Sequence, residues 1–348
     1  MTRRILLTGA AGFVGSHVLR HLLTHTDWTI ACPVTFRHKG VPARIVSALD
    51  GHPEWWDRIG VVTCDLTAPI DPVTAHMFGP VDAILNIASE SHVDRSIDVP
   101  GPFIENNVRL ITNVLHYARQ VQPAVVLHMS TDEVYGPAPL GYAHVEWDPI
   151  APSNPYSASK AAQEAVCFTY WRTYGVPVVI TNTMNIIGEQ QDPEKFVPKT
   201  IRALLAGEAP TVHVAPDGRP GSRFYLHARN LADAWLWLLH NHTPTRYDGR
   251  YTRPSRFNIV GDAEVDNITM VRTIAAHLGI PDPPMHLVDF HSSRPGHDLR
   301  YALDGTKIAN LGWRAPIKFD ESLEKTVRWS LEHPEWLGLT GAEVSRVR

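Results

Sequence analysis

The sequence predicts an α/β protein in which a doubly wound parallel sheet is followed by a smaller C-terminal region. Short apolar runs alternate with amphipathic stretches over residues 1–181, as expected when helices connect parallel strands. A glycine-rich turn comes directly after the first apolar run. Beyond residue 182 the runs become shorter and prolines, glycines and histidines more frequent, so the first pattern does not repeat.

The apolar runs and their periodicity place the individual elements. Residues 1–181 are expected to form a dinucleotide-binding domain. Residues 182–348 are expected to form mainly a substrate-binding region, with some segments returning to the first domain. Strands are predicted at residues 5–7, 28–32, 61–65, 81–87, 125–129 and 176–181, and helices at residues 16–23, 103–121, 156–174 and 231–240.

The glycine-rich turn has the spacing of a dinucleotide-binding loop. Gly9 allows a tight turn, Gly12 lets backbone approach a pyrophosphate, and Gly15 permits close packing of the helix on the strand. The helix N-terminus offers free N–H groups to phosphate. We predict that a dinucleotide binds here, with Phe13 and Val14 in contact with it. A tight turn without a ligand is the alternative.

The ends of the next two strands bear on the choice of dinucleotide. An acid at the end of the second strand would accept hydrogen bonds from the ribose of NAD, but the predicted strand ends in Cys32. Thr35 and Arg37 follow, and this basic loop either binds a 2′-phosphate or is simply solvated. Asp65 ends the third predicted strand and, with Leu66, is expected to meet the adenine side of the cofactor.

Small residues follow the fourth predicted strand. Ala88 and Ser89 would let a dinucleotide lie against the end of that strand. Asn107 lies within the helix predicted at residues 103–121. It either contributes to the cofactor site or hydrogen bonds to the backbone of a neighbouring loop.

The fifth predicted strand leads into the stretch richest in reactive side chains. Asp132 and Glu133 follow Thr131, and adjacent carboxylates act as acid and base only where their environments separate their pKa values. Tyr156 and Lys160 stand four residues apart and share one face if the segment is helical. These five residues predict a hydride-transfer base together with a separate acid–base pair. A turn-capping role for Asp132 is the alternative.

Composition argues against several other classes of protein. The 348 residues include 44% hydrophobic and 20% charged residues, as in an ordinary globular protein. A net charge of −4 argues against general nucleic-acid binding. Three cysteines without paired spacing suit a reducing compartment and give no support to a metal site. We expect a cytoplasmic protein with no metal, no nucleic-acid partner and no membrane span.

Several motifs together resemble the extended short-chain dehydrogenase/reductase family. Within it they resemble the nucleotide-sugar 4,6-dehydratases, and most closely those that act on dTDP-glucose. The resemblance covers nearly the whole chain and implies a Rossmann fold. Its motifs are residues 8–17, 89–97, 130–136, 156–160, 193–195 and 294–301.

The resemblance implies a specific chemistry. Tyr156, with its pKa lowered by Lys160, would take the proton of the sugar 4-hydroxyl while hydride leaves C4 for the nicotinamide. Thr131 would hydrogen bond near the 4-oxygen. Glu133 would remove the C5 proton, Asp132 would protonate the departing 6-hydroxyl, and the hydride would return to C6. The cofactor is regenerated in each turnover and should be held tightly.

The resemblance also implies a nucleoside-diphosphate hexose as substrate. Asn185, Arg223, Asn267 and His297 fall where the family places diphosphate contacts, although each alone could be structural. The full set of expected substrate residues is Ser91, His92, Asn185, Lys195, Arg223, Asn267, Arg294 and His297.

The chain departs from the dTDP-glucose pattern in three places. Cys32 stands where the acid of the second strand is expected, and the segments at residues 185–189 and 211–218, the latter cradling the base, are altered. His227 and Ala228 are closer to the GDP-mannose 4,6-dehydratases, which use NADP. We therefore expect a substrate other than dTDP-glucose. NAD is the favoured cofactor, with NADP as the alternative.

Other functions on the same scaffold stay open. A 4-epimerase or a decarboxylase would need Thr131, Tyr156 and Lys160 but not the carboxylate pair. A 5,6-dehydratase would use the same residues as a 4,6-dehydratase. A non-catalytic nucleotide-sugar binding protein is an alternative of another class. The family also implies a homodimer formed through the helices at residues 103–121 and 156–174.

Overall fold

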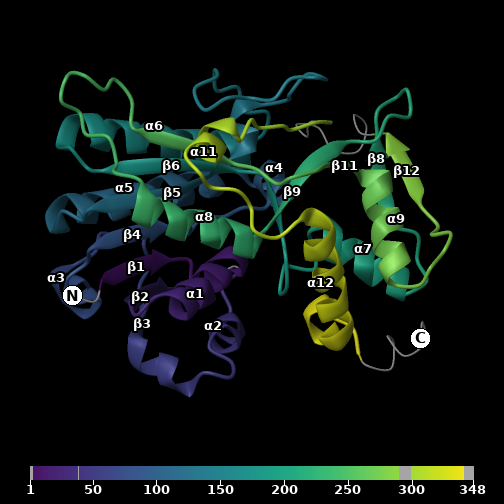
Figure 1. Ribbon diagram of the computed structural model, residues 1–348, viewed down its shortest axis with the longest axis horizontal. Coiled ribbons are helices and arrows are strands. Elements are labelled where there is room, and N and C mark those ends of the chain that lie inside the picture. Colours follow the sequence, from purple (N-terminus) through teal and green to yellow (C-terminus); the bar gives the residue numbers. More distant parts are fainter. Residues whose placement is uncertain (1–2, 38, 290–298, 341–348) are drawn as a thin grey trace.

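The computed structural model describes residues 3–37, 39–289 and 299–340, and seven parallel strands form its largest sheet (Figure 1). These strands are β1 (Arg4–Thr8), β2 (Thr29–Val34), β3 (Ile59–Thr63), β4 (Ala83–Asn86), β5 (Val125–Thr131), β6 (Val178–Thr183) and β10 (Ser255–Ile259). Their order is β10-β6-β5-β4-β1-β2-β3. The chain runs outward from β1 in one direction and then in the other, which confirms the predicted doubly wound sheet.

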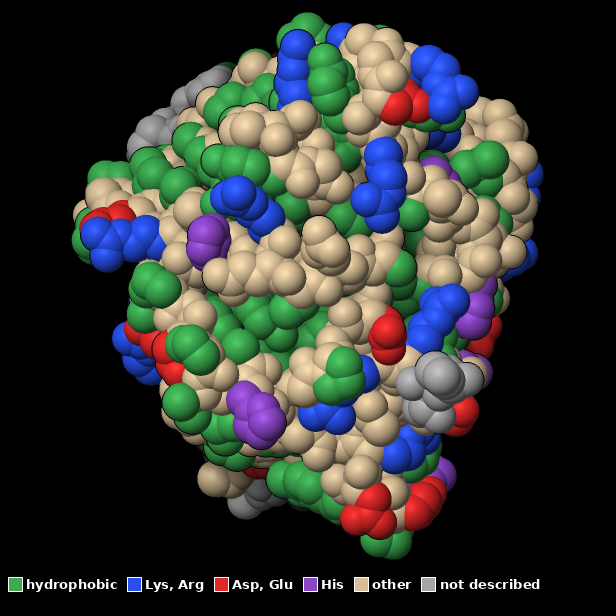
Figure 2. Space-filling model, turned by 90° about the vertical axis from the view of Figure 1, so that its left-hand side faces the viewer, with side chains coloured by type: hydrophobic (Ala, Val, Ile, Leu, Met, Phe, Trp, Pro, Cys, Tyr) green, Lys and Arg blue, Asp and Glu red, His purple; other side chains and the backbone are tan. Residues whose placement is uncertain are grey.

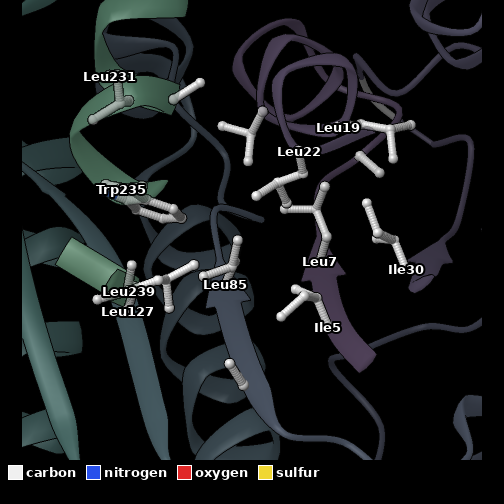
Figure 3. Close-up of a cluster of buried hydrophobic side chains, with 14 of the residues drawn as sticks. Ile5, Leu7, Leu19, Leu22, Ile30, Leu85, Leu127, Leu231, Trp235 and Leu239 are labelled. Carbon is white, nitrogen blue, oxygen red and sulfur yellow. The ribbon is translucent and has the colours of Figure 1, made fainter. Parts of the chain in front are cut away.

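Helices cover both faces of this sheet because successive residues of a strand point to opposite sides. Ile5 and Leu7 of β1 face one layer, and Leu6 faces the other. Figure 3 shows the core of the first layer, where side chains of helices meet those of the central strands. The first layer contains α1 (Phe13–His25), α2 (Pro42–Ala48) and α8 (Ala228–Asn241), and the second contains α3 (Pro72–Phe78), α5 (Pro100–Val121) and α6 (Pro155–Tyr174).

A smaller region lies beside the main sheet, at the right of Figure 1, and has a core of its own. Its strands are β7 (Asn185–Ile187), β8 (Thr211–Val214), β9 (Ser222–His227), β11 (Glu264–Asp266) and β12 (His286–Asp289). They form the sheets β11-β9-β7 and β12-β8. Its helices are α7 (Phe196–Leu205), α9 (Asn267–His277) and α12 (Phe319–Glu332). The remaining helices are α4 (Val93–Asp98), α11 (Thr306–Asn310), η1 (Pro53–Arg58), η2 (Asp132–Tyr135) and η3 (Pro334–Leu337).

The two regions share elements. Both β10 and α8 come from the part of the chain after residue 182, yet they complete the main sheet and its first helix layer. The assignment of residues 182–348 mainly to substrate binding stays a prediction. Within the described ranges, no helix combines the length and the apolar character that a membrane span requires.

The end of β2 was predicted wrongly. The strand continues past Cys32, which is fully buried, and ends at Val34. Pro33 suggests a break because it has no N–H to donate to a sheet. It is tolerated here because β2 pairs with β1 only as far as Ala31, so beyond that point only β3 lies alongside. The residues that lead out of the strand toward the cofactor loop are therefore Val34 and Thr35.

Figure 2 shows the face of the molecule that lies at the left of Figure 1, where α5 and α6 reach the surface. Hydrophobic side chains gather near the middle of this face. The helices α5 and α6 pack against each other, as a shared bundle would require. The homodimer itself stays a prediction.

Candidate active site

A cavity of about 970 Å³ opens at the carboxyl ends of the main strands. Ligands of doubly wound sheets bind at this edge, near the point where the strand order reverses. The cavity extends from the glycine-rich turn to the smaller region. The predicted cofactor residues that line it are Gly9, Gly12, Phe13, Val14, Gly15, Thr35, Arg37, Asp65, Leu66, Ala88, Ser89, Tyr156 and Lys160.

The glycine-rich turn forms a cradle that side chains would fill. Gly9 has φ +75°, and a Cβ there would lie 2.9 Å from the backbone nitrogen of Ala88. A Cβ on Gly15 would lie 2.0 Å from the carbonyl oxygen of Gly9. Gly12 precedes α1 and offers no side-chain cap, so the first N–H groups of the helix face the cavity mouth. The turn therefore fits a pyrophosphate.

An ion pair lies at the opposite end of the predicted cofactor path. The guanidinium of Arg37 contacts the carboxylate of Asp65, and both side chains are partly exposed. Asp65 also accepts hydrogen bonds from the backbone and hydroxyl of Thr67, which helps to lower its pKa despite partial desolvation. Arg37 and Asp65, both predicted to lie at the adenosine end of the cofactor, are therefore in direct contact.

Asn107 does not line the cavity. Its side chain is fully buried, accepts a hydrogen bond from the backbone N–H of Glu90, and donates to the carbonyl of Glu90 and to the hydroxyl of Ser159. Its polar groups thus hold the loop after β4, which favours the structural alternative for Asn107, and a direct cofactor contact stays a prediction. Its neighbour Asn106 is the residue that lines the cavity.

Thr131 and Asp132 mark the end of β5 at the floor of the cavity. The hydroxyl of Thr131 caps η2 by accepting from the N–H of Glu133, and it donates to Oδ1 of Asp132 at 2.8 Å. Asp132 is 4% exposed, and Oδ2 has no hydrogen-bond partner among the described residues. Burial, followed by the charge of Glu133, raises the pKa of Asp132 to about 7. The cap is Thr131, so the capping alternative for Asp132 was wrong.

Glu133 has different surroundings from its neighbour. It is only partly buried, and Nδ2 of Asn154 donates to its carboxylate at 3.1 Å. The charge of Glu133 also acts on the partly buried side chain of Lys195. A hydrogen-bond donor and a nearby cation favour an ionised carboxylate. The two adjacent carboxyls therefore have different surroundings, as an acid and a base side by side require.

Tyr156 and Lys160 lie on one face of α6, and both line the cavity. Lys160 donates to the carbonyl of Met129 at 2.7 Å and to Gln163 at 2.6 Å, and burial lowers its pKa to about 8. Burial and the charge of Glu133 raise the pKa of Tyr156. A hydrogen bond with Thr131 lowers it, but by less. The expectation that Lys160 lowers the pKa of Tyr156 is therefore not met in this structure.

The predicted substrate residues gather at the side of the cavity that faces the smaller region. The guanidinium of Arg223 stacks 4.4 Å from the ring of Tyr301, and one of its nitrogens donates to the carbonyl of Leu299. Lys195 donates to the carbonyl of Ser91 at 2.9 Å. Arg294 and His297 lie outside the described residues. Those that line the cavity are Ser91, His92, Asn185, Lys195, Arg223 and Asn267.

The structure adds residues that the sequence did not single out. Asn154 caps α6 in a reciprocal capping box with Ser157 and also holds Glu133. An Asn before Pro155 at the start of a predicted helix is a recognisable capping signal. Within the described ranges, no cluster of three or more His, Cys, Asp or Glu side chains is arranged to hold a metal ion. Further lining residues that fall in or near the quoted motifs are Thr211, His213, Tyr225 and Tyr301.

Residues 5–251 match the model of the NAD dependent epimerase/dehydratase family. The chain belongs to this family. It is 36% identical to dTDP-glucose 4,6-dehydratase of Neisseria meningitidis serogroup B, over 96% of this chain and 95% of that protein. The structure of the dTDP-glucose 4,6-dehydratase DesIV from Streptomyces venezuelae, with NAD bound, gives a TM-score of 0.83 at 33% identity, over 96% of this chain and 98% of that one. The UDP-glucose 4-epimerase of Thermus thermophilus gives a TM-score of 0.78 at 24% identity, over 94% of this chain and 98% of that one, and shares the fold alone.

Proposed function

We propose that the protein is a nucleotide-sugar 4,6-dehydratase, which converts a nucleoside-diphosphate hexose into its 4-keto-6-deoxy form with loss of one water. The observation that carries this proposal is the buried, protonatable Asp132 beside the hydrogen-bonded Glu133, in one cavity with Tyr156 and Lys160. An epimerase needs no such carboxylate pair. Full-length similarity to dTDP-glucose 4,6-dehydratases supports the same conclusion.

The cofactor we propose is NAD. The cradle formed by Gly9 and Gly15 fits a dinucleotide, and related structures contain NAD. Bound there, the nicotinamide would accept a hydride from C4 of the sugar and later return it to C6. Thr35, Arg37 and Asp65 would hold the adenosine end. NADP is the alternative, because Arg37 could also face a 2′-phosphate.

The side chains would divide the proton transfers among themselves. Tyr156 would act as a phenolate, which the positive charges of Lys160 and of a bound oxidised nicotinamide would favour, and would take the 4-hydroxyl proton as C4 becomes a ketone. Glu133 would remove the C5 proton, which the ketone makes acidic, while Asp132 donates its proton to the 6-hydroxyl as the C6–O bond breaks. Glu133 would return a proton to C5 as C6 receives the hydride. The product then differs from the substrate by one water, with no net oxidation.

The test is mass spectrometry of nucleotide sugars incubated with the purified protein. The panel holds dTDP-, UDP-, CDP- and GDP-glucose, GDP-mannose and UDP-N-acetylglucosamine. We expect loss of one water from one member, which also identifies the base and the hexose. Glu133→Gln should lower this activity by about 10²- to 10⁴-fold, the range typical of a general base, while cofactor binding is kept.

Three outcomes would contradict the proposal. Epimerisation of a panel member without loss of water would point to a 4-epimerase. Binding of cofactor and sugar nucleotide without turnover would point to a binding protein. A product that lacks one water but keeps a C5–C6 double bond would indicate that the reaction stops as a 5,6-dehydration.

A further inference from the structure

A buried ion pair lies next to the reaction site and has no role in the steps described above. Glu164 of α6 and Arg256 of β10 are each 2% exposed, and their side chains contact each other. Removing two charges from water is costly, and such pairs add little to stability compared with well-packed apolar residues. The position of this pair in the fold suggests another use for it.

The carboxylate of Glu164 is connected to the strand that carries Thr131. Its Oε1 accepts from the hydroxyl of Ser130 and from Nδ2 of Asn182 at 2.8 Å. The same Asn182 amide donates to the carbonyl of Thr131 at 3.0 Å. Glu164 therefore holds the ends of β5 and β6 together at the point where β5 enters the reaction site.

Glu164 also acts on Lys160. It follows Lys160 by four residues, so both occupy the face of α6 that carries Tyr156. Its negative charge partly offsets the burial that lowers the pKa of Lys160. The other titratable groups that face Lys160 are Cys167 on the same helix and His128 on β5. Among these groups, Glu164 supplies the negative charge.

Arg256 fixes the position of Glu164 from the far side of the sheet edge. One guanidinium nitrogen contacts Glu164 while the other donates to the carbonyl of Glu146 at 2.8 Å, and the group stacks 4.3 Å from the ring of Trp147. β10, the last strand of the sheet, thus connects α6 to the loop that follows η2.

We propose that Glu164, held by Arg256, is a positioning residue for the reaction, which places a negative charge on the face of α6 that carries Lys160 and keeps the end of β5 in place. The inference rests on the proposed function. It assigns the C-terminal half of the chain a part in organising the reaction site, through a residue that touches neither cofactor nor substrate. It therefore predicts an effect on the rate of reaction rather than on binding.

The first test needs no substrate. Unfolding midpoints of the wild type, Glu164→Gln, Lys160→Met and the double variant form a thermodynamic cycle, measured at about pH 6.5 and about pH 9. We expect a stabilising coupling between the two residues at the lower pH, where Lys160 is charged. The coupling should fall by at least about half at the higher pH, where Lys160 has lost its proton. Additive effects at both pH values would overturn the inference.

The second test uses the nucleotide sugar that the wild type converts. Glu164→Gln combined with Arg256→Met removes both charges and avoids leaving one buried alone. We expect kcat to fall at least about tenfold with KM within about twofold, since the lost interactions act in the transition state. Leu323→Ala, a core truncation in α12, is the control for general destabilisation and should leave kcat unchanged.

The outcomes separate the two proposals. If the wild type converts no sugar nucleotide, the proposed function fails, and the cycle alone decides the role of Glu164. If the wild type is active and the double variant has a normal kcat, the positioning role is overturned. A kcat that falls equally in Leu323→Ala would also overturn it.

Discussion

Asp132 and Glu133 show how far two adjacent side chains can differ in a folded protein. The first is buried with one carboxylate oxygen unpaired, and the second accepts a hydrogen bond from Asn154 near the cavity. Burial disfavours the charged form of Asp132, which is the form that a general acid must avoid before it reacts. The burial that suits Asp132 to its proposed role as an acid therefore destabilises the folded protein when the side chain is ionised.

Asp132→Asn should stabilise the protein at neutral and higher pH. Because the pKa of Asp132 is raised from 3.8 to about 7, the folded chain holds an extra proton between these values, and stability falls as pH rises through them. Above pH 7 the buried carboxylate of Asp132 lowers the free energy of unfolding by roughly 4 kcal/mol, a cost that the uncharged Asn side chain does not carry. Denaturant unfolding should give equal stabilities near pH 4 and a more stable variant near pH 8. Equal stabilities at both pH values would contradict the raised pKa.

At the scale of single elements, the start of α6 serves both the helix and the site. Asn154 caps the helix through Oδ1 and holds Glu133 through Nδ2. Asn154→Ser should keep the cap and lose the amide donor, so activity falls while stability changes little. Asn154→Ala should lose both, with about 1 kcal/mol of stability. Unfolding and turnover of both variants check this, and equal activity in the serine variant and the wild type would contradict it.

The turn before α1 makes a second prediction at this scale. Gly15→Ala would place a Cβ against the carbonyl of Gly9, so the helix must move away from the strand. We expect affinity for the nicotinamide dinucleotide to fall at least about tenfold, as measured by calorimetry. Gly101→Ala is the matched control, because a Cβ there meets nothing within 4 Å. Gly101 lies in α5, so this variant should leave cofactor binding unchanged. The protein should be as stable as the wild type or slightly more stable.

At the scale of the whole molecule, charged side chains connect the two regions across the cavity mouth. Glu194 lies 3.1 Å from Lys39 of the loop after β2 and 3.4 Å from His92 of the loop after β4. Arg44 of α2 also pairs with Asp192 at 3.4 Å. These contacts hold the segment before α7 against the loops after β2 and β4, and Lys39, His92, Asp192 and Glu194 all line the cavity.

Glu194→Gln should therefore speed cofactor release. Lys39 and Glu194 are partly exposed, and each such pair contributes about 0.2–1 kcal/mol, so we expect dissociation about two to five times faster. Added salt should narrow the difference between variant and wild type, because salt screens exposed charges. Displacement of bound cofactor followed by fluorescence would measure both rates. An unchanged rate at low salt would show that these contacts do not retain the cofactor.

Local sequence patterns predicted much of the fold and of the site. They failed where residues far along the chain determine the structure, as at the end of β2. The parallel sheet followed from its apolar runs, whereas the end of β2 depended on which strands flank Pro33. The residue types of the reaction site followed from spacing, whereas the hydrogen bonds of Asn107 to Glu90 and Ser159 depend on segments far along the chain. The roles of the lining residues stay predictions.

The sequence by itself determined the alternation of the main strands and helices over residues 1–181, the glycine cradle and the reactive residues at the end of β5, because each depends on neighbours within a few positions. Only the tertiary structure decided which of these groups are buried and how their pKa values shift. It also brought Glu164 to Arg256, 92 residues further along the chain. Burial and contacts between distant segments arise from packing, and no local spacing encodes them.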